Sequence, residues 1–221
     1  MDDYSCDVLV LGIGNLLWAD EGFGVRCVEA LAEHYDLPPS VHIMDGGTQG
    51  LYLLPYVQGA KRLIVFDAID YGLEPGTMKR VLNEEVPRFM GAKKMSLHQT
   101  GFQEVIAAAE FTGQCPAEML LIGVQPVELE DYGGSLRPLV KAKVPEALAV
   151  AVAQLRAWGV TVTPKAAGQH GLSDDALAMG RYEAERPSAE EACRFGDDRF
   201  LRIREETEIG TEEPISTGGA V

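Results

Sequence analysis

Apolar residues recur with two different periods along the first 165 residues of the chain. Short apolar runs of the kind found in strands buried on both faces occupy four ranges: 7–12, 41–45, 62–69 and 118–124. Between them, apolar positions recur every three or four residues, which predicts amphipathic helices over 22–36, from 98 onward and over 137–158. This alternation predicts an α/β fold, a single domain with a twisted, mostly parallel sheet of about five strands sandwiched between helices.

Weaker signals complete this prediction. Residues 76–82 alternate and predict an edge strand, whose direction is either parallel or antiparallel. VTVT at 160–163 predicts a last short strand, and 48–57 predicts a short helix or irregular turn limited by Pro55. Within 137–158, Pro145 predicts the start of a second helical segment, because proline suits the first turn of a helix.

The composition changes after Lys165. Residues 166–221 contain thirteen acidic residues and six arginines, and they lack long apolar periodicity. We therefore expect an α/β domain over 1–165, followed by an acidic C-terminal extension over 166–221 that is partly disordered. A docking role for a short element within the extension is the alternative.

Charge and cysteine usage indicate which classes of partner are disfavoured and which cellular compartment to expect. The formal net charge of −15 argues against nucleic acid and anionic membranes as partners, because phosphate contacts need clustered Lys and Arg. The four cysteines are scattered, which favours reduced thiols. The N-terminus MDDYSCD is acidic, unlike a signal peptide, and no apolar run reaches the length of a membrane span. We expect a soluble, cytoplasmic protein, and a monomer rather than an oligomer.

The stretch GIGNLLWADEG, residues 12–22, combines a glycine turn with two acids. A glycine turn after a strand often binds phosphate, but no GK[ST] follows, and Leu17 stands where G-x-G-x-x-G needs its third glycine. Asp20 and Glu21 would also repel phosphate. A nucleotide-binding α/β protein is therefore a minor alternative.

Acids and a histidine follow the ends of the predicted parallel strands. Glu21 follows the first strand, Asp45 ends the second, Asp67 lies in the third, and His98 opens a helix. Ligands of open α/β sheets bind outside the carboxyl ends of the strands. Three carboxylates and an imidazole converging there predict a site for a cation of intermediate hardness.

Each of these residues also has a structural explanation. Asp20 or Glu21 could cap the following helix, Asp45 could be a turn residue before Gly46–Gly47, and His98 alone is more often structural. Asp67 is harder to explain this way, because it interrupts the apolar run LIVFDAI and pays a desolvation cost unless it is paired or bound.

Five segments together carry a resemblance to a known family. They are LGIGNLLWADEGFGVRCVEAL, MDGGTQGLYLL, LIVFDAID followed by GTM, SLHQTGF, and LIGVQPVELE. In this order and at these separations they resemble the maturation endopeptidases of nickel–iron hydrogenases, over about Val8–Pro164. The subtype looks closest to proteases that serve membrane-bound uptake hydrogenases.

The resemblance implies that the protein removes a C-terminal peptide from the hydrogenase large-subunit precursor after nickel insertion. The family's metal-contacting residues fall on Glu21, Asp67 and His98. Asp45, Gly46, Gly47 and Thr48 match a motif implicated in substrate binding. Nickel would be supplied by the precursor, and no permanent metal is expected.

The hydrolytic step is open between two routes. Either the shared metal polarises the scissile carbonyl or activates water, or a carboxylate acts as general base, with Asp45 a candidate beside Glu21 and Asp67. The chain has neither G-x-S-x-G nor H-E-x-x-H, so serine and zinc protease templates find no support. A nickel-binding chaperone that holds the precursor without cutting it is the main alternative.

Overall fold

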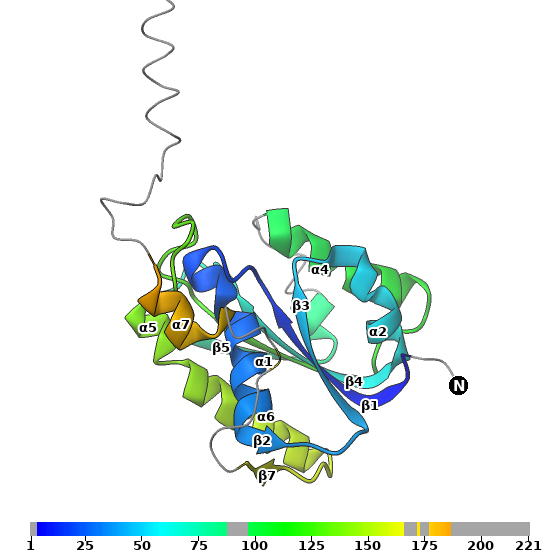
Figure 1. The fold of residues 1–221 in the computed structure, drawn as a ribbon. Helices are drawn as coiled ribbons and strands as arrows, with labels where there is room; N and C mark the ends of the chain where they lie inside the picture. Colours follow the sequence, from blue (N-terminus) through cyan, green and yellow to red (C-terminus); the bar gives the residue numbers. More distant parts are fainter. Residues whose placement is uncertain (1–3, 88–96, 166–171, 173–176, 187–221) are drawn as a thin grey trace, which may run out of the picture. The chain divides into compact units, whose positions relative to one another are not determined.

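The sheet of the computed structural model contains five strands in the order β3-β1-β4-β6-β5 (Figure 1). The model describes residues 4–87, 97–165, 172 and 177–186, and for 97–100 the backbone. The strands are β1 (Cys6–Ile13), β3 (Val41–Gly47), β4 (Ala60–Ala68), β5 (Met78–Leu82) and β6 (Glu118–Val124). All pairs are parallel except β5 with β6, so the predicted mostly parallel sheet is confirmed, and 76–82 contains an antiparallel edge strand.

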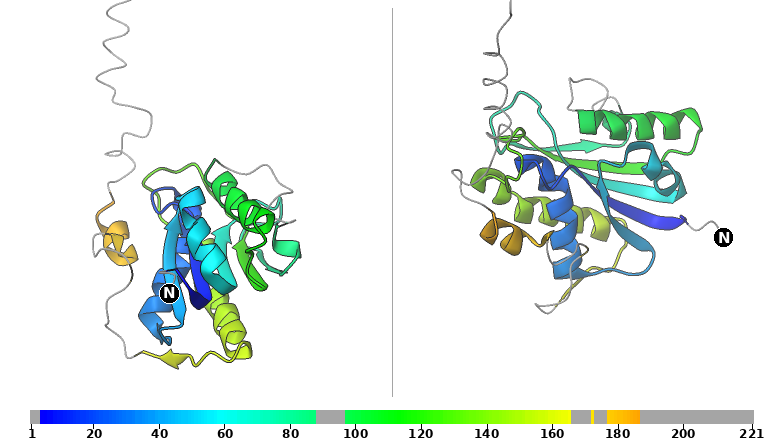
Figure 2. Two further views of the ribbon diagram at one scale, coloured as in Figure 1. Left: turned by 90° about the vertical axis from the view of Figure 1, so that its right-hand side faces the viewer. Right: turned by 45° about the horizontal axis from the view of Figure 1, so that its top comes forward.

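Helices cover both faces of the sheet (Figures 1 and 2). One face packs against α1 (Phe23–His34) and α6 (Val144–Ala157), and its core includes Val10, Ile64 and Ile122. The other face packs against α2 (Leu54–Gly59) and α4 (Leu97–Phe111), with Leu9, Leu63 and Leu121 in its core. Neighbouring residues of one strand thus enter opposite cores, as the period of two requires, and this explains the continuous apolar runs.

Two glycines let α1 lie directly on the sheet. A Cβ on Gly24 would collide with the backbone oxygens of Ile13 and Phe66, and one on Gly12 would collide with the backbone of Gly24. The first turn of α1 therefore contacts the ends of β1 and β4 without intervening side chains. This close approach fixes the connection between β1 and α1 over the carboxyl edge of the sheet.

Two expected boundaries are wrong. The helix expected over 22–36 ends at His34, because Tyr35 is extended and forms β2 (Tyr35–Asp36) with β7 (Thr163–Pro164) in a separate antiparallel pair. The strand expected over 160–163 begins only at Thr163. Gly159 has φ +81° and ends α6, after which Val160 and Val162 pack into the core rather than alternating in a strand.

Other expected helical features are confirmed. The predicted stripe on α4 is buried, namely Phe102, Val105, Ile106 and Ala109. Residues 137–158 divide into α5 (Pro138–Lys141) and α6, with Pro145 in the first turn of α6. Segment 48–57 forms the 3-10 helix η2 (Gly50–Leu53) and then α2.

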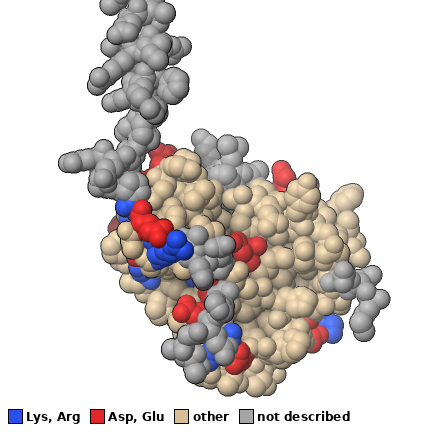
Figure 3. All heavy atoms as spheres, in the orientation of Figure 1, with Lys and Arg blue, Asp and Glu red and all other residues tan. Residues whose placement is uncertain are grey.

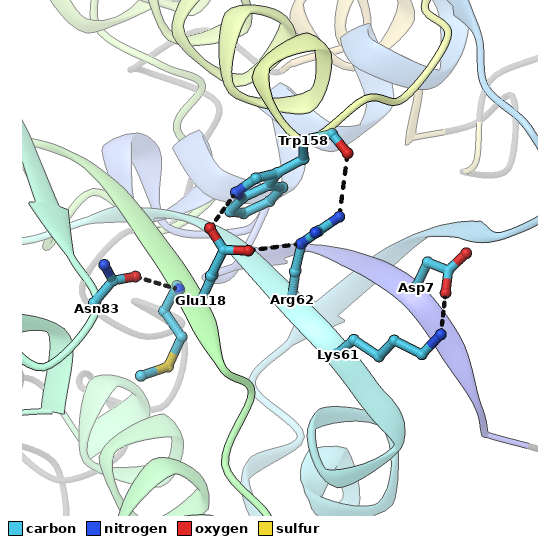
Figure 4. A network of polar contacts seen from close by, with 7 residues as sticks. Asp7, Lys61, Arg62, Asn83, Glu118 and Trp158 are labelled. Atoms are coloured by element: carbon cyan, nitrogen blue, oxygen red, sulfur yellow. Dashed lines mark hydrogen bonds and ion pairs between the residues drawn. The ribbon is translucent and has the colours of Figure 1, made fainter.

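Charged side chains at the amino edge of the sheet are paired with one another (Figure 4). Arg62 donates from Nε to Glu118 over 2.8 Å and from Nη1 to the Trp158 carbonyl over 3.2 Å, and Trp158 donates to Glu118 over 2.9 Å. Lys61 and Asp7 form a second, exposed pair at 2.6 Å. This network connects β1, β4 and β6 to the end of α6.

Part of the C-terminal extension packs on the α/β domain. Helix α7 (Met179–Ala184) is held through Glu183, which accepts hydrogen bonds from Lys141 over 2.8 Å and from Ser135 over 2.9 Å. Arg26 of α1 donates to the Leu177 carbonyl over 2.6 Å. Figure 3 accordingly shows acidic and basic side chains side by side around α5 and α7. Residues Met1–Glu185 form one compact unit.

The expected domain limit after Lys165 and the disorder of the extension stay predictions, and 187–221 lie outside the described residues. Cys6, Cys27 and Cys115 are free thiols, while Cys193 lies outside the described residues. Within the described part of the chain, no helix combines the length and apolar character needed to cross a membrane.

Candidate active site

The glycine turn after β1 places Glu21 at the carboxyl edge of the sheet. The chain leaves β1 at Ile13 and forms the 3-10 helix η1 (Ala19–Gly22) before α1 begins. Gly14 has φ +132°, and a Cβ there would collide with the carbonyl oxygen of Glu21. The turn therefore needs glycine for its geometry, and it brings Glu21 back over the end of β1.

Asp20 holds the neighbouring segment of the backbone. Its side chain is fully buried, and its Oδ2 accepts hydrogen bonds from the backbone N–H groups of Val127 and Glu128 over 2.8 and 3.0 Å. Its Oδ1 accepts a third from Arg137 over 2.7 Å. Asp20 thus fastens the chain after β6 to η1. Neither Asp20 nor Glu21 makes a side-chain cap on α1, whose N-cap residue is Gly22.

Asp67 lies at the carboxyl end of β4, between Phe66 and Ala68, and is 1% exposed. Its Oδ2 is buried and accepts no hydrogen bond from the described residues. Burial raises the pKa of Asp67 well above its usual range, while a hydrogen bond from the Ala68 N–H lowers it and the charge of Glu21 raises it further. Burial and the charge of Glu21 therefore favour the protonated form of Asp67.

Glu21 and Asp67 form what we call the acid pair. Glu21 is 8% exposed, and its charge is the one that acts on Asp67. Two buried carboxylates repel each other unless they share a proton or a cation. This pair is consequently a place where an arriving cation would gain two oxygen ligands and relieve an unfavourable interaction.

Asp45 ends β3 at the same edge but on the other face of the sheet. It pairs with Gly12 in register and alternates with Val41 and Ile43, which pack toward α1. Asp67, in contrast, alternates with Leu63 and Val65, which pack toward α2 and α4. The structure thus brings Glu21 and Asp67 together and places Asp45 apart from them.

The surroundings of Asp45 are those of a tight turn. Its Oδ1 accepts a hydrogen bond from the Gly47 N–H over 2.8 Å. Burial raises the pKa of Asp45, the Gly47 hydrogen bond lowers it, the charge of Glu29 raises it and that of Arg26 lowers it. Arg26 is the residue that also holds the extension at Leu177. Arg26 therefore connects the surroundings of Asp45 to the segment that carries α7.

The glycines after Asp45 are required by the fold. A Cβ on Gly46 would lie 2.9 Å from the side chain of Ile13, and Gly47 has φ +47°. The Gly47 carbonyl accepts a hydrogen bond from the Gly14 N–H over 3.0 Å, which ties the end of β3 to the glycine turn. Thr48, the next residue, is exposed. A substrate-binding role for 45–48 stays a prediction.

His98 is the second residue of α4, and its side chain lies outside the described residues. The direction of α4 nevertheless indicates where the backbone of His98 lies. Gln58, just before the amino end of β4, donates to Thr112, just after α4, over 2.9 Å. The end of α4 therefore lies at the amino edge, and its beginning, with His98, lies toward the carboxyl edge and Asp67.

No group of three or more His, Cys, Asp or Glu side chains able to hold a metal ion occurs among the described residues. The described part of the site supplies two oxygen donors, and the expected third ligand, His98, lies outside it. Two carboxylates are hard oxygen donors, and an imidazole added to them would suit a cation of intermediate hardness.

Sequence reasoning missed the residues that shape the surroundings of Asp67. Gln125, directly after β6, is 6% exposed and accepts hydrogen bonds from the N–H groups of Tyr71 and Leu73 over 2.7 and 3.1 Å. Tyr71 is also buried. A glutamine at the end of a fully apolar strand was the available signal, since such a side chain needs buried partners.

Comparisons with known proteins identify the class. A family model described as hydrogenase maturation protease, HycI, matches residues 25–154, more than half of the chain. The chain belongs to the hydrogenase maturation protease family. This confirms the resemblance read from the five segments, and with it the protease class.

Individual relatives are similar over most of their length. The chain is 63% identical over 194 residues to the hydrogenase expression/formation protein HupD of Rhodobacter capsulatus, a match that covers 88% of this chain and 92% of HupD. It is 61% identical over 195 residues to HoxM of Azotobacter vinelandii, covering 88% and 94%. Both matches are longer than the expected 1–165 domain, so they include part of the extension.

Solved structures share the fold. The hydrogenase maturating endopeptidase HybD from Escherichia coli superposes with a TM-score of 0.68 at 44% identity, covering 72% of this chain and 98% of HybD. HybD from Thermococcus kodakarensis, a [NiFe] hydrogenase maturation protease, gives a TM-score of 0.53 at 29% identity, covering 67% and 98%.

Proposed function

We propose that this chain is the endopeptidase that removes the C-terminal peptide from the nickel-loaded precursor of a [NiFe] hydrogenase large subunit. Membership of the maturation protease family supports the reaction class. The observation that carries the proposal is the buried acid pair, because Asp67 Oδ2 is buried at the carboxyl edge and accepts no hydrogen bond from the described residues. A substrate-held cation would satisfy it.

Nickel enters this proposal as part of the substrate. A nickel ion already held by precursor cysteines would take oxygen ligands from Glu21 and Asp67 and a nitrogen ligand from His98, a set suited to a transition metal. Because burial keeps the pKa of Asp67 high, metal binding displaces a proton there. A precursor without nickel gains none of these contacts, so processing waits for metal insertion.

The acid pair contributes to the hydrolytic step by placing the metal against the scissile bond, where a metal polarises a carbonyl or activates water. General-base catalysis by Asp45 is the alternative route. The position of Asp45 on the face of α1, with Oδ1 engaged by Gly47, supports the first route, and we propose that residues 45–48 bind the substrate. We further propose a cytoplasmic monomer that serves a membrane-bound uptake hydrogenase.

Intact-mass measurement of the purified nickel-loaded precursor tests this function. The wild-type chain is expected to release the C-terminal peptide, and the nickel-free precursor is expected to keep it. Asp67→Asn, which preserves side-chain volume, is expected to abolish the mass loss. Glu104→Gln, at an exposed acid on α4, is the matched control and should cut normally.

A stable complex without mass loss would overturn the protease and leave the nickel-binding chaperone. This result is decisive when a related maturation protease cuts the same precursor preparation in parallel.

A further inference from the structure

The loop after β4 folds back over the sheet beside Asp67. Tyr71, four residues beyond Asp67, is 7% exposed and packs in the core on the α2 and α4 face. Its hydroxyl occupies the space above Gly123, so that a Cβ on Gly123 would collide with it. Gly123 is the residue of β6 that pairs in register with Asp67. The tyrosine hydroxyl therefore takes the place of a β6 side chain next to Asp67.

This placement puts the phenol next to the acid. Paired residues on adjacent strands point to the same face, and adjacent strands lie about 4.8 Å apart. The space above Gly123 is thus about one strand spacing from the Asp67 side chain. Asp67 in turn acts electrostatically on Tyr71, and burial together with this charge raises the pKa of the phenol above its usual range. The O–H of a phenol is a hydrogen-bond donor.

Gln125 fixes the loop in this conformation. Besides the two bonds from Tyr71 and Leu73 to its Oε1, it donates from Nε2 to Asp70 Oδ1 over 2.9 Å. The Ile69 N–H bonds to the Val124 carbonyl over 2.9 Å. One buried side chain therefore holds three residues of the loop in place around Tyr71.

Lys79 holds the other side of the tyrosine ring. Lys79 pairs with Gly123 from β5, and its Nζ lies 5.3 Å from the centroid of the Tyr71 ring, within range of a cation–π interaction. On this face of the sheet, three neighbouring positions thus follow one another across the strands. Lys79 lies on β5, the Tyr71 ring lies above Gly123 of β6, and Asp67 lies on β4. The ring has a defined position rather than a choice of packings.

We propose that Tyr71 is a positioning residue for Asp67, whose hydroxyl donates a hydrogen bond to the Asp67 carboxylate when that carboxylate binds the incoming cation. The bond would fix which carboxylate oxygen faces the cation. The identity of that cation, nickel held by the precursor, rests on the proposed function. Partners of this kind around metal-binding carboxylates are worth about 10- to 100-fold in metal affinity or activity.

Tyr71→Phe tests the role of the hydroxyl, because phenylalanine keeps the ring above Gly123 and its contact with Lys79. Binding of Ni²⁺ alone to the full chain, measured by calorimetry, is expected to weaken about 10- to 100-fold. The kcat for nickel-loaded precursor is expected to fall by a similar factor, with the affinity for nickel-free precursor and the Tm unchanged. Tyr56→Phe, at a half-buried tyrosine on α2, is the control and should match the wild type.

Gly123→Ala tests the role of the Tyr71 hydroxyl in a second way, because it would displace the hydroxyl rather than remove it. The added Cβ would enter the space of the hydroxyl, so it should lower kcat in the wild-type background and have a smaller effect in the Tyr71→Phe background. Additive effects of the two substitutions would contradict the proposal, as would unchanged Ni²⁺ affinity and kcat in Tyr71→Phe. If the wild type binds Ni²⁺ but cuts no precursor, the proposed function fails, while the Ni²⁺ affinities still decide the role of Tyr71.

Discussion

The two edges of the sheet treat charged side chains differently. At the amino edge, Arg62, Glu118 and Trp158 satisfy one another, and both charged groups remain partly exposed (Figure 4). At the carboxyl edge, Glu21 and Asp67 are buried neighbouring acids, and the negative charge of Glu21 raises the pKa of Asp67. An exposed, paired network contributes little stability, and the burial of two neighbouring acids reduces it. This difference supports our proposal that the carboxyl edge carries the active site.

A second contrast lies within the glycine turn itself. Asp20 and Glu21 are adjacent acids, and both are buried. Asp20 has three backbone N–H partners, so its charge is compensated within the fold. Glu21 instead lies where its charge acts on Asp67. Asp20 is therefore structural, while we propose that Glu21 belongs to the site, and substitutions should separate the two roles.

The largest expected effect is on activity in Glu21→Gln. The amide preserves volume but is a poor ligand for a cation, so cleavage of nickel-loaded precursor should fall by about 100-fold or more. The Tm should stay the same or rise, because a buried charge beside Asp67 is removed. Rates from intact mass and thermal melts measure both. Full cleavage by Glu21→Gln would remove Glu21 from the site.

Asp20→Asn, in contrast to Glu21→Gln, should lower the stability of the fold. An amide in its place would oppose backbone N–H donors with its own NH₂ group, and the loss of charge-assisted bonds should cost about 2–4 kcal/mol of unfolding free energy. Glu118→Gln at the amino edge is the comparison, with an expected cost below about 1 kcal/mol. Urea titrations of both variants measure the difference. Equal costs would mean that the two edges do not differ as described.

Removal of the extension should have a moderate effect. Deleting 166–221 takes away the Leu177 carbonyl from Arg26 and the Tyr182 ring that lies 5.7 Å from its guanidinium. We expect about 1–2 kcal/mol of lost stability. Because Arg26 acts on Asp45, we also expect weaker selectivity between precursors of different hydrogenases, measured by competition. Unchanged stability and selectivity would leave the extension without a role at this edge.

The smallest effect concerns pH. The folded pKa of Asp67 is raised, so the folded chain keeps a proton that the unfolded chain releases. Its contribution to stability is therefore full below about pH 4, the unfolded value, and is lost as pH rises toward the folded value. Wild type without a bound cation should lose stability relative to Asp67→Asn as the pH rises above about 4. A constant difference across this range would contradict the burial of an ionisable Asp67.

Sequence patterns predicted the parts of the molecule that depend on local periodicity. The strands of the sheet, α4 and the break before Pro145 follow from spacing and from proline chemistry. Asp67 was recognisable because an acid in an apolar strand has few structural explanations. Family resemblance, rather than spacing, selected Glu21 over Asp20, since both acids precede the same helix.

Other features depend on contacts that no local pattern encodes. The sheet face of Asp45 is set by which helices cover which side, and Asp20 becomes structural only when residues 127–137 fold onto it. The Tyr71 hydroxyl lies next to Asp67 because it occupies the space above Gly123, on a strand more than fifty residues later in the chain. Such relations require the register of β4 and β6, which the sequence leaves unspecified.

Nickel K-edge X-ray absorption of the nickel-loaded precursor, alone and frozen with the protein before cleavage, shows whether the acid pair binds the precursor nickel. Wild-type protein is expected to add oxygen and nitrogen ligands to this nickel. The double variant Glu21→Gln, Asp67→Asn is expected to add fewer, although it still binds the precursor. Identical nickel spectra with and without the wild-type protein, in a complex shown to be formed, would contradict the proposal that the acid pair binds the precursor nickel.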